Sequence, residues 1–174
     1  MHKHIQIRLK ANTLLILLGI LIVPCLYPQQ QTTVGGMSLT HRLVDDRVEF
    51  ILTAPTTGWL GIGFNDRNNI VGSDLYLLHV VNGKATGQDM YVKAAGDPRL
   101  DQTLGGTDDL KIISGQEENN ETTIVFSLPL ASADQNDFQL EAGKDMWLIL
   151  AYSAHDEFDH HSRMRKHIRF TLTH

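Results

Sequence analysis

The sequence predicts an all-β domain built as an antiparallel sandwich of two packed sheets. Three observations support this fold class. Apolar side chains alternate with a period of two from Met37 onward, turn-forming residues separate short runs, and the chain holds 14 glycines but only 7% aromatic residues. A chain of 174 residues has the size of one domain, and its 42% hydrophobic content is enough for one core between two sheets.

Residues 1–31 are predicted to be a signal peptide that precedes the fold. A start with three basic residues leads into the apolar run 14–23, and Pro24 ends that run. The run is short for a membrane span, so a cleaved signal is the main expectation and a membrane anchor is the alternative. The protein is therefore expected to be exported, either to the periplasm, to the cell surface or as a secreted protein.

The remaining segment, residues 32–174, is acidic and contains no cysteine. Removing residues 1–31 removes three Lys and Arg residues and no acids, so the formal net charge falls from −5 to −8. This balance argues against a nucleic-acid partner. The one cysteine, Cys25, lies in the signal segment, so no Cys-x-x-Cys-His motif can attach haem covalently. Any prosthetic group must be held by non-covalent contacts.

The first clear strand is predicted over 47–54. Val48, Phe50 and Leu52 share one face, while polar residues alternate with them on the other face. The same alternation predicts two later half-buried strands, whose inward residues are Ile124, Phe126 and Leu128 in one and Ile168, Phe170 and Leu172 in the other.

Three runs are apolar throughout, which is typical of central strands covered on both faces. They are "GWLGIGF" at 58–64, "DLYLLHVV" at 74–81 and "MWLILAY" at 146–152. Trp59 and Trp147, in the first and third runs, are expected to anchor the core, with stacking on a cofactor as the alternative for both.

Turn residues connect these strands at short intervals. Asp45-Asp46, Asn82-Gly83 and Asn119-Asn120 each predict a tight hairpin connection. No helix is expected after the signal segment. Many short strands joined by such turns predict an immunoglobulin-like sandwich.

The motifs of the chain, taken in order, resemble the DOMON family, which is named from the N-terminal domain of dopamine β-monooxygenase and is related to the cytochrome domain of cellobiose dehydrogenase. The resemblance covers about Met37 to Leu172. It rests on "GWLGIGF", "GSDLYLLHV", "GQDMYV", "DPRLDQTLGGTDDLKIISG", "TTIVFSLPLASADQNDFQL" and "AYSAHDEFDHH". It implies a β-sandwich that binds haem b or another small ligand, such as a sugar, in a pocket at one end.

In the haem-binding members of this family, a methionine and a histidine from two loops hold the iron from opposite sides. Such a pair favours electron transfer over oxygen binding. The family pattern around the methionine is close to Asn-x-Met-x-Gly-Ala-Asp, and this chain reads Asn68-Asn69-Ile70-Val71-Gly72-Ser73-Asp74. Ile70 stands at the methionine position and cannot bind iron, whereas Asp74 is retained beside the expected pocket.

The histidine side of the pattern is present in "HDEFDHHSRMRKH". His161 fits the family position best and is the candidate iron or metal ligand, with His160 beside it. The alternative is a solvated polar loop. The possible replacements for the missing methionine are Met37, Met90, Met146, Met164 and His79. Strand packing is the simpler expectation for Met90, Met146 and His79, and Met164 is expected on the loop of His161.

We therefore expect a non-catalytic binding module that holds haem b or another small ligand, with His161, His160, Ile70, Asp74 and Trp59 at its site. A membrane cytochrome or another redox partner is expected if the module carries electrons. The alternative is a haem-free module for a sugar, a phenolic compound or an interaction partner. A copper or zinc site on the histidine-rich loop is a third hypothesis. Enzyme activity is not expected, because no nucleophile elbow or complete metal triad is present.

Overall fold

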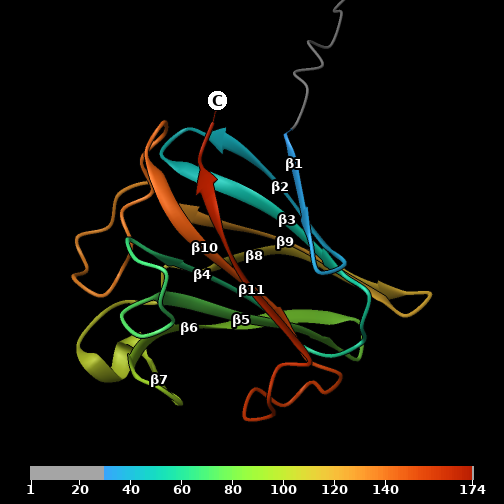
Figure 1. Cartoon of the computed structure of the whole chain (residues 1–174). Coiled ribbons are helices and arrows are strands. Elements are labelled where there is room, and N and C mark those ends of the chain that lie inside the picture. The colour runs from blue at the N-terminus through green and yellow to red at the C-terminus, as the bar shows by residue number, and fades with distance from the viewer. Residues whose placement is uncertain (1–29, 174) are drawn as a thin grey trace, which may run out of the picture.

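The computed structural model describes residues 30–173, and it confirms the antiparallel two-sheet sandwich (Figure 1). One sheet has five strands in the order β1 (Gln31–Val34), β2 (Met37–Val44), β3 (Arg47–Ala54), β9 (Glu121–Pro129) and β8 (Lys111–Glu118). The other has six strands in the order β11 (Met164–Thr171), β10 (Asp145–Tyr152), β4 (Leu60–Asn65), β5 (Asp74–Val81), β6 (Lys84–Ala94) and β7 (Asp97–Leu100). One short 3₁₀ helix, η1 (Asp101–Leu104), is the helical element of the described residues.

The predicted turns form where the sequence places them. Asp45, Asn82, Asn119 and Asn120 all have positive φ angles, and Gly83 follows Asn82 with a φ of 73°. Asn, Asp and Gly adopt this left-handed conformation at the lowest cost. These turns set the register of the β2–β3, β5–β6 and β8–β9 hairpins.

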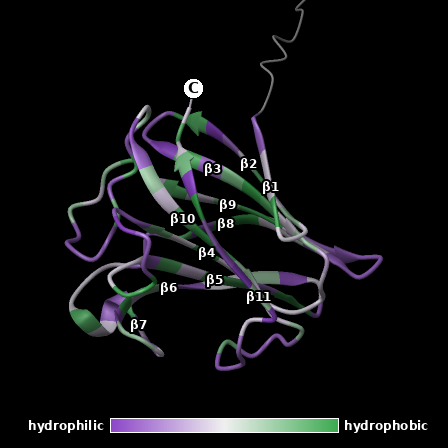
Figure 2. Cartoon of the chain, viewed as in Figure 1, coloured by the Kyte–Doolittle hydropathy of each residue, from purple (hydrophilic) through white to green (hydrophobic). Residues whose placement is uncertain are grey.

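The core lies between the two sheets and is filled by the inward half of each strand. Phe50 of β3 stands 5.4 Å from Phe126 of β9 and 5.7 Å from Phe64 of β4, measured between ring centroids. All three side chains are fully buried. In Figure 2 the apolar segments lie mostly along the strands, and the polar segments lie mainly in the loops and turns.

The six-stranded sheet also carries a second apolar cluster on its outer face. It consists of Trp59, Leu75, Leu77, Met90, Val92 and Ala151, with Ile70 and Phe158 packed against it. This explains why the central runs are apolar throughout: β4, β5 and β10 are covered on both faces. Trp59 is buried as expected, but in this outer cluster. Trp147 is only partly buried, with the Arg169 guanidinium 4.7 Å from its ring centroid, so the expectation that it anchors the core was wrong.

Most of the predicted signal peptide lies outside the described residues. Its predicted last residue, Gln31, begins β1 and pairs with Thr40. Within residues 30–173, no helix is long and apolar enough to cross a membrane.

Candidate functional site

The outer apolar cluster forms the floor of a cavity of about 610 Å³. The floor comes from strands β4, β5, β6 and β10, and two loops form its rim. One rim loop contains Ile70 and the other contains His160 and His161. A volume of this size suits a cofactor or another small ligand. The pocket was expected at one end of the sandwich, but the cavity lies on the outer face of the six-stranded sheet.

Glycines in β4 keep this floor open. Gly61 lies between Trp59 and Leu77, and a Cβ atom there would come within 3.3 Å of the Trp59 ring and 3.2 Å of Leu77 Cδ2. A side chain at this position would fill the space above the sheet. The glycines of "GWLGIGF" therefore shape the cavity as well as the strand.

The Ile70 loop is held to the sheet by its own backbone and by Asn65. The Gly72 amide donates to the Val92 carbonyl at 2.8 Å, and Gly72 has a φ of 84° that favours glycine. Asn65 Nδ2 donates to the Asn69 carbonyl at 2.8 Å, and Ser73 Oγ donates to the Ile70 carbonyl at 2.7 Å. These bonds orient Ile70 toward the cavity, where its side chain offers only apolar contact.

The second rim loop, residues 153–163, is called the lid loop here. Its start is fastened to the Trp59 backbone by two hydrogen bonds of 2.9 Å, one from the Trp59 amide to the His155 carbonyl and one from the Ser153 amide to the Trp59 carbonyl. Ser153 Oγ also donates to the His161 carbonyl at 3.2 Å. The lid loop is therefore fixed to Trp59, the residue before β4, and the exposed residue His161 lines the cavity.

His79 supports the lid loop from the sheet. Its Nδ1 lies 3.0 Å from the Asp156 carbonyl oxygen, its Nε2 lies 2.8 Å from Thr86 Oγ1, and its ring packs 4.4 Å from that of Phe158. His79 thus uses both ring nitrogens within the protein. It is a positioning residue for the lid loop and is not free to act as a ligand.

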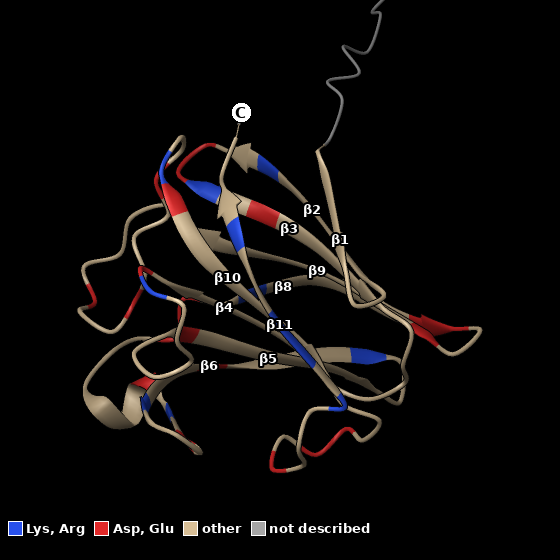
Figure 3. Cartoon of the chain, in the orientation of Figure 1, with Lys and Arg blue, Asp and Glu red and all other residues tan. Residues whose placement is uncertain are grey.

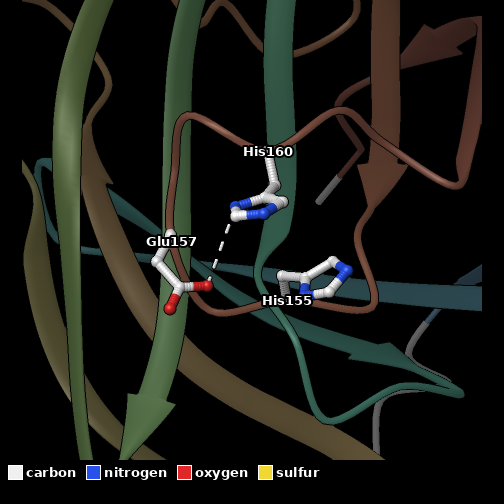
Figure 4. A group of neighbouring side chains, drawn as sticks. All are labelled: His155, Glu157 and His160. Atoms are coloured by element: carbon white, nitrogen blue, oxygen red, sulfur yellow. Dashed lines mark ion pairs between the residues drawn. The ribbon is translucent and has the colours of Figure 1, made fainter.

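The lid loop also gathers three exposed groups that could hold a metal ion, which Figure 4 shows together. The rings of His155 and His160 stack at 4.3 Å, and His160 Nδ1 lies 3.7 Å from a carboxylate oxygen of Glu157. His160 Nδ1 is also 3.3 Å from Asp159. The predicted metal ligand, His161, is not part of this group.

Asp74 does not line the cavity, which departs from its place among the expected site residues. It precedes Leu75 on β5, and neighbouring residues of a strand face opposite sides of the sheet. Asp74 is 4% exposed and accepts hydrogen bonds from the Phe138 amide and the Tyr76 hydroxyl, both at 3.0 Å. Burial, followed by the charges of Asp89 and Asp137, raises the pKa of Asp74 well above its usual value.

The four remaining expected site residues, Trp59, Ile70, His160 and His161, all line the cavity. Of the methionines, Met37 and Met146 are in the core, and Met164 begins β11 and packs against the core. Met90 is different, because it lies in the cavity wall at 8% exposure. The alternation of Gln88, Met90 and Val92 along β6 would have identified this wall, since all three line the cavity.

The fold and the site define a β-sandwich with a lidded apolar cavity on its six-stranded sheet. A model of the DOMON domain family matches residues 34–153, and the chain belongs to this family. It is 32% identical over 110 residues to "DBH-like monooxygenase protein 2" of Mus musculus and 26% identical over 115 residues to "MOXD1 homolog 2" of Drosophila melanogaster. These matches cover 63% and 66% of this chain but only 17% and 15% of the two relatives.

Two solved structures share the fold at low sequence identity. The cytochrome domain of Myriococcum thermophilum cellobiose dehydrogenase superposes with a TM-score of 0.60 at 13% identity, covering 84% of this chain and 78% of that one. The cytochrome b domain of pyranose dehydrogenase from Coprinopsis cinerea gives a TM-score of 0.58 at 9% identity, covering 78% and 76%. Identities this low establish a common fold.

Proposed function

We propose that this DOMON domain is an exported binding module that takes a flat, largely apolar ligand in the lidded cavity, and that haem b is this ligand. The single observation that carries the proposal is the meeting of the Ile70 loop and the lid loop over one apolar floor of the six-stranded sheet. Two proteins of the same fold are described as cytochrome domains, which supports haem b in particular.

The cavity residues fit haem b on one side better than on the other. His161 offers an imidazole at the rim, Arg165 offers a guanidinium that could pair with a propionate, and the outer cluster offers apolar contact to the ring. The other rim loop offers Ile70, whose side chain has no atom that can bind iron. His161 is therefore the residue that would hold the haem iron, and Met90 in the wall is the one thioether among the cavity residues.

Bound haem b would supply a one-electron iron couple, and the domain would then serve extracytoplasmic electron transfer with a membrane cytochrome or another redox partner. The chain's own residues would bind the group, exclude water and set the ligand field. The proposed role is binding and electron transfer rather than catalysis, and it includes no nucleic acid.

A second candidate is a haem-free module for a sugar, a phenolic compound or a similar small ligand. Two features favour it. Ile70 removes the family's second iron ligand, and the buried Trp59 Nε1 has no hydrogen-bond partner among the described residues. A ligand with an acceptor atom could satisfy that indole N–H, since buried donors normally have a partner.

Absorption spectroscopy of the purified protein from haem-supplemented cells separates the two candidates. Haem binding predicts a Soret band that is lost in His161→Ala and kept in His160→Ala, which changes the neighbouring imidazole as a matched control. A colourless wild-type protein that also fails to bind added haemin would overturn the haem proposal. A melting-temperature rise with a sugar or phenolic compound in such a protein would then support the second candidate.

A further inference from the structure

On the face of the six-stranded sheet opposite the cavity, five aspartates lie close together. They form two groups that share Asp137, and in each group one carboxylate oxygen per residue lies within 4.8 Å of the others. We call these residues the acidic cluster: Asp74, Asp89, Asp101, Asp134 and Asp137. They come from β5, β6, η1 and the loop between β9 and β10, and acidic segments in these regions gather at one end of the molecule in Figure 3.

Three of these carboxylates are buried with oxygens that have no hydrogen-bond partner. Asp74, Asp89 and Asp101 are 4%, 3% and 2% exposed. One oxygen of Asp74, one of Asp89, both of Asp101 and both of Asp137 lack a hydrogen-bond donor among the described residues, which makes six such oxygens over the two groups. Buried carboxylates are normally paired or bound to a metal, so this number of free oxygens points to a missing cation.

The other carboxylate oxygens already have donors, which fix the side chains in place. The Asp109 amide donates to Asp89 Oδ2 at 3.0 Å, and the Phe138 amide donates to Asp74 Oδ2 at 3.0 Å. The Thr107 amide donates to Asp134 Oδ2 at 2.6 Å. Each of these three carboxylates therefore has one oxygen used for positioning, and Asp74 and Asp89 each keep the other oxygen free.

Within residues 30–173, none of the ion pairs involves a cluster carboxylate. The nearby Arg47 donates to the carbonyls of Asp109 and Ser127, Arg67 pairs with Asp66 at 3.1 Å, and Lys144 pairs with Glu141 at 3.1 Å.

Without a bound cation, ionisation of the buried carboxyl groups in the acidic cluster is unfavourable. Burial, with repulsion from Asp101 and other neighbouring carboxylates, raises the pKa of Asp89 to about 7. Burial also raises the pKa of Asp137 to about 8. At neutral pH such groups favour either a proton or a bound cation.

Gly106, in the loop after η1, allows two carboxylates of the acidic cluster to lie close together. A Cβ atom at Gly106 would lie 2.9 Å from Asp101 Oδ2 and would overlap Asp134 Oδ2. The η1 loop can therefore bring the two carboxylates together only with glycine at this position. Two surface clefts, one lined by Gly106, Asp109 and Asp134 and the other by Asp74 and Asp137, give an ion access from solvent.

We propose that the acidic cluster is a calcium site centred on Asp137, where the two carboxylate groups meet. All the donors are oxygen atoms and no histidine or cysteine belongs to either group, which suits Ca²⁺ and disfavours zinc or copper. Ca²⁺ takes six to eight oxygen ligands, so each group of three carboxylates would supply part of the shell and water from the clefts would supply the rest. The ion would tie the η1 loop and the β9–β10 loop to β5 and β6.

The test is a Ca²⁺ titration of the EDTA-treated protein at pH 8, followed by calorimetry and by thermal unfolding. Wild-type protein is expected to bind Ca²⁺ saturably, at least one ion per chain, with a clear rise in melting temperature. Asp101→Asn and Asp137→Asn should each weaken Ca²⁺ binding by about tenfold or more, because each removes a charged ligand. Asp108→Asn makes the same charge change at an exposed position of the η1 loop and should leave the affinity within about twofold, since Asp108 offers no ligand.

The variants also separate a cation site from carboxylates that merely share protons. In the metal-free state Asp101→Asn removes a buried unpaired charge, so its melting temperature should equal or exceed that of metal-free wild type. A lower value would overturn the proposal. So would a wild-type protein that shows no saturable Ca²⁺ binding up to about 10 mM, or Asp101→Asn protein that binds Ca²⁺ as tightly as wild type.

Discussion

Trp59 and His155 are joined backbone to backbone, with the Trp59 amide donating to the His155 carbonyl at 2.9 Å. This bond couples the cavity floor to the lid loop. It depends on Gly58, because a Cβ atom there would lie 2.4 Å from the His155 amide nitrogen. The conformation of the lid loop is therefore set by a residue that does not line the cavity.

Gly58→Ala should displace the lid loop. The new methyl group cannot be accommodated against the backbone of His155, so we expect a loss of about 1–3 kcal/mol in the free energy of unfolding and weaker ligand binding. Chemical denaturation measures the first effect and haemin titration the second. Thr57→Ala, at the exposed neighbouring position, is the control and should change neither quantity. Gly58→Ala protein with unchanged stability would show that the loop moves aside at no cost.

Thr56 is a second fastening point of the lid loop. Its hydroxyl donates to the Ser153 carbonyl and accepts a bond of 3.1 Å from the Gly58 amide, and the residue is 8% exposed. Thr56→Val keeps the shape and removes both bonds, which leaves two buried backbone groups without partners. The expected loss is about 1–3 kcal/mol in the free energy of unfolding. Thr56→Ser keeps the hydroxyl and should lose less than half as much. Equal losses in the two variants would contradict the assignment of the Thr56→Val loss to the two hydrogen bonds.

Much of the fold could be predicted because its signals are local. Period-two alternation identified strands such as 47–54, and Asn82-Gly83 identified a hairpin, since both depend only on neighbouring residues. The face of the cavity could not be predicted in the same way. The runs around Trp59 and Leu75 are apolar on both faces, so the sequence does not distinguish the core side from the cavity side.

The site could be predicted only in part, because local sequence patterns do not show which distant residues the fold brings together. The Ile70 loop and the lid loop were expected together because of the family resemblance, and both line the cavity. Asp74 was expected with them, but strand alternation turns it to the other face of β5, where it joins the acidic cluster. That cluster draws on residues as distant as Asp74 and Asp137, and only the sheet topology brings them together.

Ile70→Met would restore a thioether at the family's ligand position. Ile70 and His161 line the same cavity from different loops, so a methionine there could reach a haem iron held by His161. We expect haemin affinity to rise by about tenfold or more, equivalent to about 1.4 kcal/mol, with a shift to a six-coordinate low-spin spectrum. Ile70→Leu adds no donor and is the matched control. Equal affinities of the Met and Leu variants would mean that position 70 does not face the iron.

His41 predicts a pH dependence of stability that is independent of the cavity. It is 7% exposed, its Nε2 lies 3.1 Å from both the backbone oxygen and the backbone nitrogen of Thr173, and its ring packs 5.3 Å from that of Phe170. Burial lowers the pKa of His41 below its usual value of 6.5, although its hydrogen bond to the Thr173 backbone acts in the opposite direction. The neutral ring is therefore the form that the folded protein favours.

The direction of the effect follows from this shift. Above pH 6.5 the ring is neutral in the folded and unfolded chains, so the stabilisation by His41 is complete. As the pH falls through 6.5 toward the lowered pKa of the folded state, the unfolded chain binds a proton first and stability is lost. His41→Gln cannot titrate, so the stability difference between wild type and this variant should shrink from pH 7.5 to pH 5 in saturating Ca²⁺, measured by urea denaturation. A constant difference for His41→Gln over this pH range would contradict the assignment.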